Sequence, residues 1–127
     1  MLFVTDSKKD VDTAARDVEE AVKRNGFGVL HVYDLQEKLR EKGVDLPHAC
    51  RILEVCNPKQ AAKVLAADME VSLALPCRIS VYDDGGQTKI GTIQPTALLS
   101  IFPGAAALQP VAEEVEQVLV KIIEEAR

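Results

Sequence analysis

The sequence predicts an α+β fold in which helices pack on one face of an antiparallel or mixed sheet. Two segments with one apolar stripe each, residues 11–22 and 110–126, lie near the two ends of the chain. Between them lie several stretches rich in β-branched and aromatic residues, which favour strands. Two of these stretches surround DDGGQ, a hairpin signal with glycines available for positive φ. Helices that flank a run of strands are typical of a layered α+β domain, and 127 residues suit a single domain spanning 1–127.

The first elements are a short strand at Leu2–Thr5 and a helix that follows it. Ser7 is expected to cap this helix, with Asp10 in the position of a capping box. Asn25-Gly26 ends the helix, and Phe27 can fold back on it as in a Schellman motif. The apolar residues of the helix recur at the spacing of one buried face: Val11, Ala14, Ala15, Val18, Ala21 and Val22.

The remaining elements lead to a sheet with one uncovered face. Strands are predicted at Phe27–Tyr33, Ala49–Cys56, Arg78–Tyr82 and Lys89–Gln94, and helices at Leu35–Lys42, Pro58–Ala67 and Thr96–Phe102. Pro110 is expected to open the last helix at its first position, where a missing N–H costs nothing. The buried stripe of that helix is Val115, Val118, Leu119, Ile122 and Ala126. If both long helices cover one sheet face, a second subunit is expected to cover the other, which predicts a homodimer.

Composition argues against two classes of partner and indicates a location. A net charge of −5, only 4% aromatic residues and no Trp argue against nucleic acid and anionic membrane as partners. The start, MLFVTDSKKD, has no signal-peptide pattern, and three irregularly spaced cysteines make a poor disulfide framework. We therefore expect a cytoplasmic protein with reduced thiols. The apolar segment 97–108 is broken by Pro103-Gly104 and is too short to span a bilayer, so we expect it to form an additional contact surface.

Two stretches in the second half resemble a known family. CNPKQAAKVL and LALPCRISVYDDGGQTKIGTIQP are similar to the domain of unknown function DUF302, through Asn57-Pro58, Leu75-Pro76 and Pro95. The likeness extends to the front helix that ends in Asn25-Gly26-Phe27. The resemblance implies a TBP-like α+β fold, with a mostly antiparallel sheet and helices on one face, and a tendency to form homodimers. It implies no activity.

Cys56 is a candidate reactive residue because it directly precedes the helix that Asn57-Pro58 opens. A thiol near a helix N-terminus can have a lowered pKa, and Lys59 in the first turn could assist. Cys77 begins a strand that can lie beside Cys56, so the pair could serve redox or sulfur-handling chemistry or hold a soft metal. The alternative is that both are small buried hydrophobic residues.

Asn57 has a structural and a functional interpretation. Asn at the N-cap satisfies free backbone N–H groups, and Pro58 fits the first helical position. The functional alternative is a site for a small anionic ligand on the free N–H groups, assisted by Lys59.

The third strand contains Glu54, which lies either on the core face, where it would need a charged partner, or on the open sheet face, where it could join a polar cluster. Strand alternation places Cys50, Ile52, Glu54 and Cys56 on one face. In neighbouring strands His31 and Arg78 can reach Glu54 if they share that face. The three residues then form a polar pocket or a dimer-interface network, or are ordinary exposed side chains.

The signatures of common enzyme and metal sites are missing. Gly85-Gly86 is not followed by the Lys-Ser/Thr of a phosphate-binding loop, and no G-x-S-x-G occurs. His48 and Cys50 form at most half of a metal site, so we expect neither metal nor cofactor. The sequence thus predicts a homodimeric ligand-binding or interaction module without catalysis. The alternative is a thiol-dependent protein that uses Cys56 and Cys77.

Overall fold

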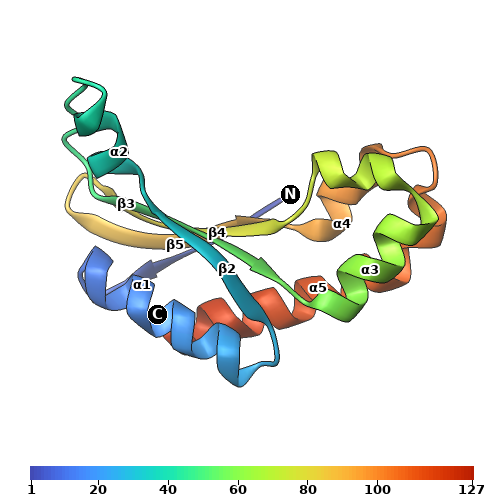
Figure 1. The fold of residues 1–127 in the computed structure, drawn as a ribbon. Helices are drawn as coiled ribbons and strands as arrows, with labels where there is room; N and C mark the ends of the chain where they lie inside the picture. The colour runs from blue at the N-terminus through green and yellow to red at the C-terminus, as the bar shows by residue number, and fades with distance from the viewer.

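The computed structural model describes all 127 residues and confirms the α+β prediction (Figure 1). One sheet has the strand order β1-β5-β4-β3-β2, and every neighbouring pair is antiparallel. The strands are β1 (Leu2–Ser7), β2 (Gly28–Asp34), β3 (Cys50–Cys56), β4 (Cys77–Asp84) and β5 (Gln87–Ile93). The helices are α1 (Val11–Arg24), α2 (Leu35–Glu41), α3 (Pro58–Ala67), α4 (Pro95–Leu98) and α5 (Ala105–Ala126), with 3₁₀ turns η1 (Met69–Leu73) and η2 (Leu99–Ile101). Helices α1 and α5 lie on one face of the sheet, as expected.

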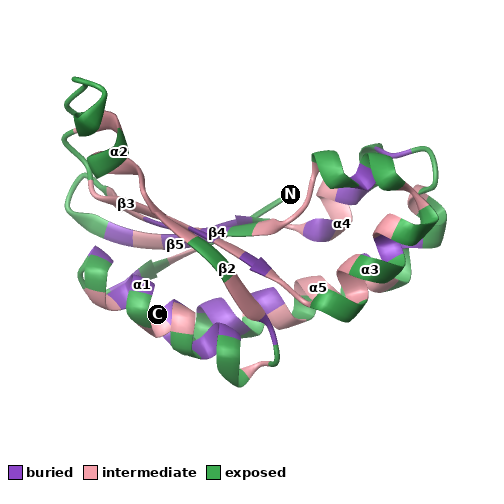
Figure 2. Cartoon of the chain, in the orientation of Figure 1, coloured by how far each residue is buried: buried purple, intermediate pink, exposed green.

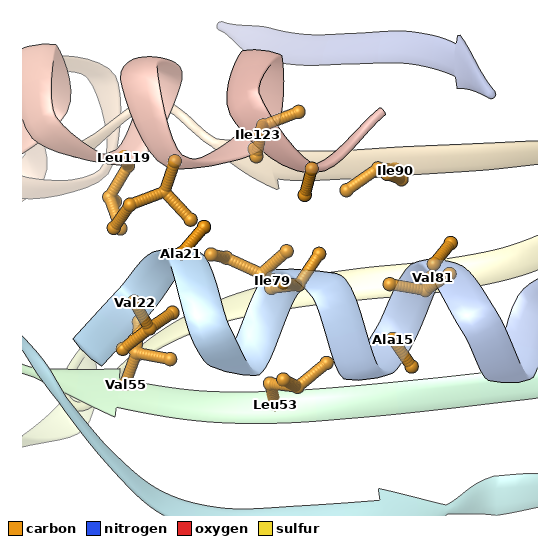
Figure 3. Close-up of a cluster of buried hydrophobic side chains, with 14 of the residues drawn as sticks. Ala15, Ala21, Val22, Leu53, Val55, Ile79, Val81, Ile90, Leu119 and Ile123 are labelled. Atoms are coloured by element: carbon orange, nitrogen blue, oxygen red, sulfur yellow. The ribbon is translucent and has the colours of Figure 1, made fainter. Parts of the chain in front are cut away.

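The main core lies between the sheet and these two helices (Figures 2 and 3). All six residues that the helical spacing assigned to the buried face of α1 are buried. In β3, Leu53 and Val55 are fully buried against the helices, so the strand alternation predicted from the sequence is confirmed. Each large apolar side chain buried in this way contributes about 1.5–3 kcal/mol, which fixes the register of the central strands.

The end of α1 agrees with the prediction, whereas its start does not. The N–H of Phe27 donates to the Val22 carbonyl at 3.0 Å while Gly26 has φ 78°, which is the predicted Schellman motif. The N-cap is Asp10, whose Oδ1 accepts from the Thr13 N–H at 2.7 Å. Ser7 was predicted to cap this helix, and that is wrong, because pairing with β5 extends β1 through Ser7.

The last helix begins at Ala105, so the prediction that Pro110 opens it is wrong. Pro110 lies inside the helix, where it cannot donate a backbone hydrogen bond. The turn before it contains three alanines, which have the highest helix propensity, and Leu108, which is buried. Burial of Leu108 and the alanine-rich turn therefore outweigh the hydrogen bond that Pro110 cannot make.

A second, smaller core explains the apolar segment 97–108. Six buried residues form it: Val64, Val71, Leu99, Phe102, Leu108 and Ala112. Three of them belong to the segment, and only Ile101, with 73% of its surface exposed, is a large apolar residue pointing to solvent. The buried residues of the segment pack against α3 and α5 of the same chain, and the expected contact surface stays a prediction for the exposed side of the segment. No helix in the structure has the length and apolar character needed to cross a membrane.

Candidate functional site

A largely apolar pocket is lined by residues from the end of β3, the start of β4, α3, α4 and α5. Figure 1 shows that these elements come together at one end of the sheet. We call this pocket the sheet-end pocket. Its volume is about 260 Å³, and 14 of its 19 lining residues are hydrophobic. The strands contribute Val55 and Cys77, α3 contributes Val64, α4 contributes Leu98, and α5 contributes Val115. A concave, mostly apolar site with few polar groups is the usual form of a small-molecule site.

Two local hydrogen-bonding devices hold the helices around this pocket. The Asn57 Oδ1 accepts from the backbone N–H groups of Lys59 and Gln60, at 3.1 and 3.2 Å, so α3 starts immediately after β3. The Glu116 carboxylate of α5 accepts from the N–H and the hydroxyl of Thr96, at 3.1 and 2.6 Å. Because Thr96 is in the first turn of α4, this contact fixes the short helix α4 to α5 at the pocket.

No side chain that lines the pocket carries a formal charge. Its polar side chains are Asn57, Gln60 and Ser72. The side-chain oxygen of Gln60, Oε1, is buried and has no hydrogen-bond partner. An unsatisfied buried acceptor costs about 1–3 kcal/mol, and most such groups in proteins are paired. This oxygen is also closed to water, so it does not face the open space of the pocket.

Cys56 and Cys77 both line the pocket, so the structure brings the two predicted thiols to one place. Burial raises the pKa of Cys77 to about 11, and the neighbouring Cys56 contributes to this shift. Burial also raises the pKa of Cys56. Thiol chemistry needs the thiolate, which a lowered pKa supplies, so both shifts are opposite to what the redox or sulfur-handling alternative requires.

The backbone groups proposed for an anion are already in use. The N–H groups of Lys59 and Gln60 donate to the Asn57 side chain, which confirms the capping interpretation of Asn57. Lys59 is exposed and does not line the pocket. The geometry at α3 therefore supports a neutral ligand better than an anionic one.

The polar residues predicted for the open sheet face form one row across three strands. Glu54 pairs in register with His31 of β2 and with Arg78 of β4. The Arg78 Nε lies 3.9 Å from a Glu54 carboxylate oxygen, with 66% of the Arg78 side chain and 14% of the Glu54 side chain exposed. The pKa of Tyr33 is raised, mainly by its hydrogen bond to Glu54 and to a smaller extent by burial. The rings of Tyr33 and His31 pack edge to face, with their centroids 4.2 Å apart. Glu54 thus faces away from the core and has both a cation and a hydroxyl beside it.

Apolar side chains lie at the other side of the same open face. Leu2 of β1 pairs in register with Ile93 of β5, and Val4 pairs with Gly91. Leu2, Val4 and Ile93 are exposed by 67%, 43% and 49%. None of them belongs to either buried core, so no helix of this chain covers this part of the sheet.

Comparison with known proteins identifies the family. A family model described as "Domain of unknown function DUF302" matches residues 3–126. The chain belongs to the DUF302 family. A crystal structure of an uncharacterized conserved DUF302 protein from Bacillus stearothermophilus is 37% identical, with a TM-score of 0.92. The match covers 99% of this chain and 98% of that one. A search of curated proteins found no match.

Sequence reasoning found part of this DUF302 pocket and missed the rest. It selected Cys56, Asn57 and Cys77, all of which line the pocket. It missed Gln60, although this residue directly follows Lys59 in the first turn of α3. The only available signal was a polar residue among the alanines and valine of a short helix. That signal is weak, because a helix exposes some of its residues in any case.

Proposed function

We propose that this DUF302 protein is a homodimeric ligand-binding module without catalysis of its own, which binds a small apolar molecule in the sheet-end pocket. The observation that carries the proposal is an apolar pocket of about 260 Å³ without a charged side chain in its lining. No acid, base or cation is present there to act on a bound molecule. The raised pKa values of Cys56 and Cys77 also leave the two thiols protonated at neutral pH.

Binding in the pocket can be tested by filling it. Ala61 lines the pocket from α3, whereas the next residue, Ala62, is exposed. We expect p-xylene to shift the amide NMR signals of pocket residues, and Ala61→Leu to weaken its binding about tenfold or more, which corresponds to ~1.4 kcal/mol. Ala62→Leu is the matched control and should bind as the wild type does. Equal binding by both variants, or no binding by the wild type, would contradict the proposal.

The homodimer is proposed to form through the open sheet face. A two-fold axis places the same patch of each subunit against itself. Leu2, Val4 and Ile93 would lose their contact with water there, which favours association. The exposed Arg78 lies beside Glu54, so the row carries both signs of charge and can complement a second copy of itself.

Ile93 and Ile101 provide a matched test of this interface. Both are exposed, at 49% and 73%, but Ile93 is on the open sheet face and Ile101 is on η2. In size-exclusion chromatography with light scattering, we expect the wild type and Ile101→Lys to have the mass of a dimer, and Ile93→Lys that of a monomer. A monomeric wild type at micromolar concentration would rule out the dimer.

We also propose that the fold is TBP-like and the protein cytoplasmic. The antiparallel sheet with helices on one face supports the first, as the resemblance to DUF302 implies. The three unpaired cysteines support the second, because free thiols are typical of a reducing compartment.

A further inference from the structure

We infer that the protein has a second binding site, which takes a carboxylate with a short apolar body and uses Arg78 to bind its charge. The site is a pocket of about 230 Å³, lined by the start of β4, the end of β5, the loop before β4 and Leu98 of α4. We call it the strand-split pocket. Unlike the sheet-end pocket it carries a cation, so it suits a different class of ligand.

The strand-split pocket exists because β4 and β5 stop pairing before either strand ends. Their last register pair is Ser80 with Gly91, although both strands continue beyond it. From there β4 stays paired with β3 and β5 stays paired with β1, so the two strands separate. The Thr92 hydroxyl crosses the gap and donates to the Arg78 carbonyl oxygen at 2.7 Å. This hydrogen bond holds the backbone of Arg78 at the edge of the pocket.

The charge of Arg78 is available to a ligand. Arg78 is the one charged residue among the nine that line the pocket, and its side chain is mostly exposed. Its ion pair with Glu54 spans 3.9 Å, which is too long for a hydrogen bond. An exposed pair of this kind contributes little, and the planar guanidinium can instead donate two parallel hydrogen bonds to a ligand carboxylate.

The rest of the lining selects an apolar body for the ligand. Six of the nine residues are hydrophobic. Two of them, Leu73 and Ile93, are exposed, and a bound apolar group would remove part of their surface from water. An engineered apolar cavity of about 150 Å³ accommodates benzene, so about 230 Å³ suits one ring or a short branched chain. Acetate has the charge without the body and should bind more weakly.

The site can be separated from the two features proposed above. Four residues line both pockets and therefore form the wall between them, whereas Arg78 lines only the strand-split pocket and Ala61 only the sheet-end pocket. Arg78 and Ile93 also belong to the open sheet face, so in the proposed dimer the strand-split pocket borders the interface. All of its lining residues come from one chain.

The test is an NMR titration of the full chain with 3-methylbutanoate, which is ionised at pH 7, and with its neutral isostere 3-methylbutanamide. Arg78→Met removes the cation, and Arg78→Lys keeps the charge without the planar fork. Arg40→Met is the matched control, because Arg40 is exposed on α2 and its loss changes the net charge equally. Ala61→Leu fills the sheet-end pocket instead. Thermal unfolding checks that each variant is folded.

We expect 3-methylbutanoate to shift the amide signals of residues that line the strand-split pocket. It should bind the wild type, Arg40→Met and Ala61→Leu equally. Arg78→Met should weaken this binding about tenfold or more, and Arg78→Lys should weaken it less. The wild type should bind the neutral amide about tenfold or more weakly than the acid, because the charge-assisted hydrogen bonds are lost.

Four results would overturn the inference. Two need no variant: the wild type does not bind the acid, or it binds the acid and the amide equally. An equal loss in Arg78→Met and Arg40→Met would show that only net charge attracts the anion. A loss in Ala61→Leu would place the acid in the sheet-end pocket. Binding of p-xylene tests the proposed function separately, so either proposal can fail alone.

Discussion

Gly91 of β5 is predicted to be essential for the packing of the edge strand β1 on the open sheet face. A Cβ at this position would lie 2.9 Å from Val4 Cγ2 and 3.2 Å from the Phe3 carbonyl oxygen. Carbon atoms in favourable contact are about 3.5–4.0 Å apart. Gly91→Ala would therefore force the Val4 side chain either to move away by about 0.6 Å or more, or to adopt another rotamer. Gly91 has no positive φ, so backbone strain does not contribute.

The size of the effect follows from two opposing terms. Overpacking of this kind costs about 1–3 kcal/mol. Replacing Gly by Ala restricts the unfolded chain and offsets about 0.4–1 kcal/mol of that cost. We therefore expect Gly91→Ala to lower the free energy of unfolding by about 1–2 kcal/mol, which is roughly 4–8 °C in Tm for a domain of this length.

A double-mutant cycle isolates the contact responsible. In a Val4→Ala background the clashing Cγ2 atom is gone. The contact with the Val4 Cβ, at 3.5 Å, is ordinary, and the tight contact with the Phe3 carbonyl oxygen, at 3.2 Å, remains. The part of the cost that comes from Val4 Cγ2 should then disappear, which gives a coupling energy of about 1 kcal/mol between the two positions. Urea unfolding of the four proteins at one fixed protein concentration measures it.

Gly28 of β2 provides the control for this cycle. A Cβ at Gly28 would find only the Cys56 carbonyl oxygen, at 3.9 Å, so Gly28→Ala should be neutral or slightly stabilising. The reasoning is refuted if Gly91→Ala unfolds at the same urea concentration as the wild type. It is also refuted if the cost of the substitution is the same with and without Val4.

Three further predictions concern the helix caps and the thiol. Asn57→Ala should lower the free energy of unfolding by about 1 kcal/mol in urea titrations, whereas Asn57→Asp, which can still cap α3, should not; equal loss in both would argue against the cap. Burial raises the pKa of Cys77 to about 11, so the rate at which iodoacetamide alkylates Cys77 should rise about tenfold per pH unit between pH 8 and pH 10. An alkylation rate that levels off near pH 8 would instead support a reactive thiolate. The backbone hydrogen bond from Thr13 lowers the pKa of Asp10, so the cap on α1 should be at full strength above the unfolded pKa of about 3.9 and weaken as the pH falls through the lower folded value. Thermal melts should therefore show a difference between wild type and Asp10→Asn that changes below about pH 4, because Asn does not titrate; a constant difference would exclude this linkage.

The fold class and most elements could be predicted from the sequence because they depend on local spacing, whereas the family was recognised from its resemblance to DUF302 motifs. The buried face of α1 follows from helical periodicity, and the start of α3 follows from Asn57-Pro58. The alternation of β3 placed Glu54 opposite Leu53 and Val55, and the register shows it beside His31 and Arg78. The buried face of α1, the start of α3 and the alternation of β3 are decided by residues close to one another in the chain, whereas the contacts of Glu54 with His31 and Arg78 depend on the pairing of distant strands.

The errors arose where a distant segment outweighs a local signal. Ser7 looks like a helix cap, but hydrogen bonding to β5, about eighty residues later, extends the strand through it. Pro110 looks like a helix start, but burial of Leu108 in the second core favours an earlier turn.

The sequence by itself determined the α+β fold, the DUF302 membership and the three pocket residues Cys56, Asn57 and Cys77. Only the tertiary structure decided that these residues line an apolar pocket, that the thiols are held protonated, and that Gln60 has a buried oxygen without a partner. The physical reason is that burial depends on segments from β3, β4, α3, α4 and α5 meeting in space. Desolvation and an unpaired acceptor are consequences of that meeting, and no single stretch of sequence encodes them.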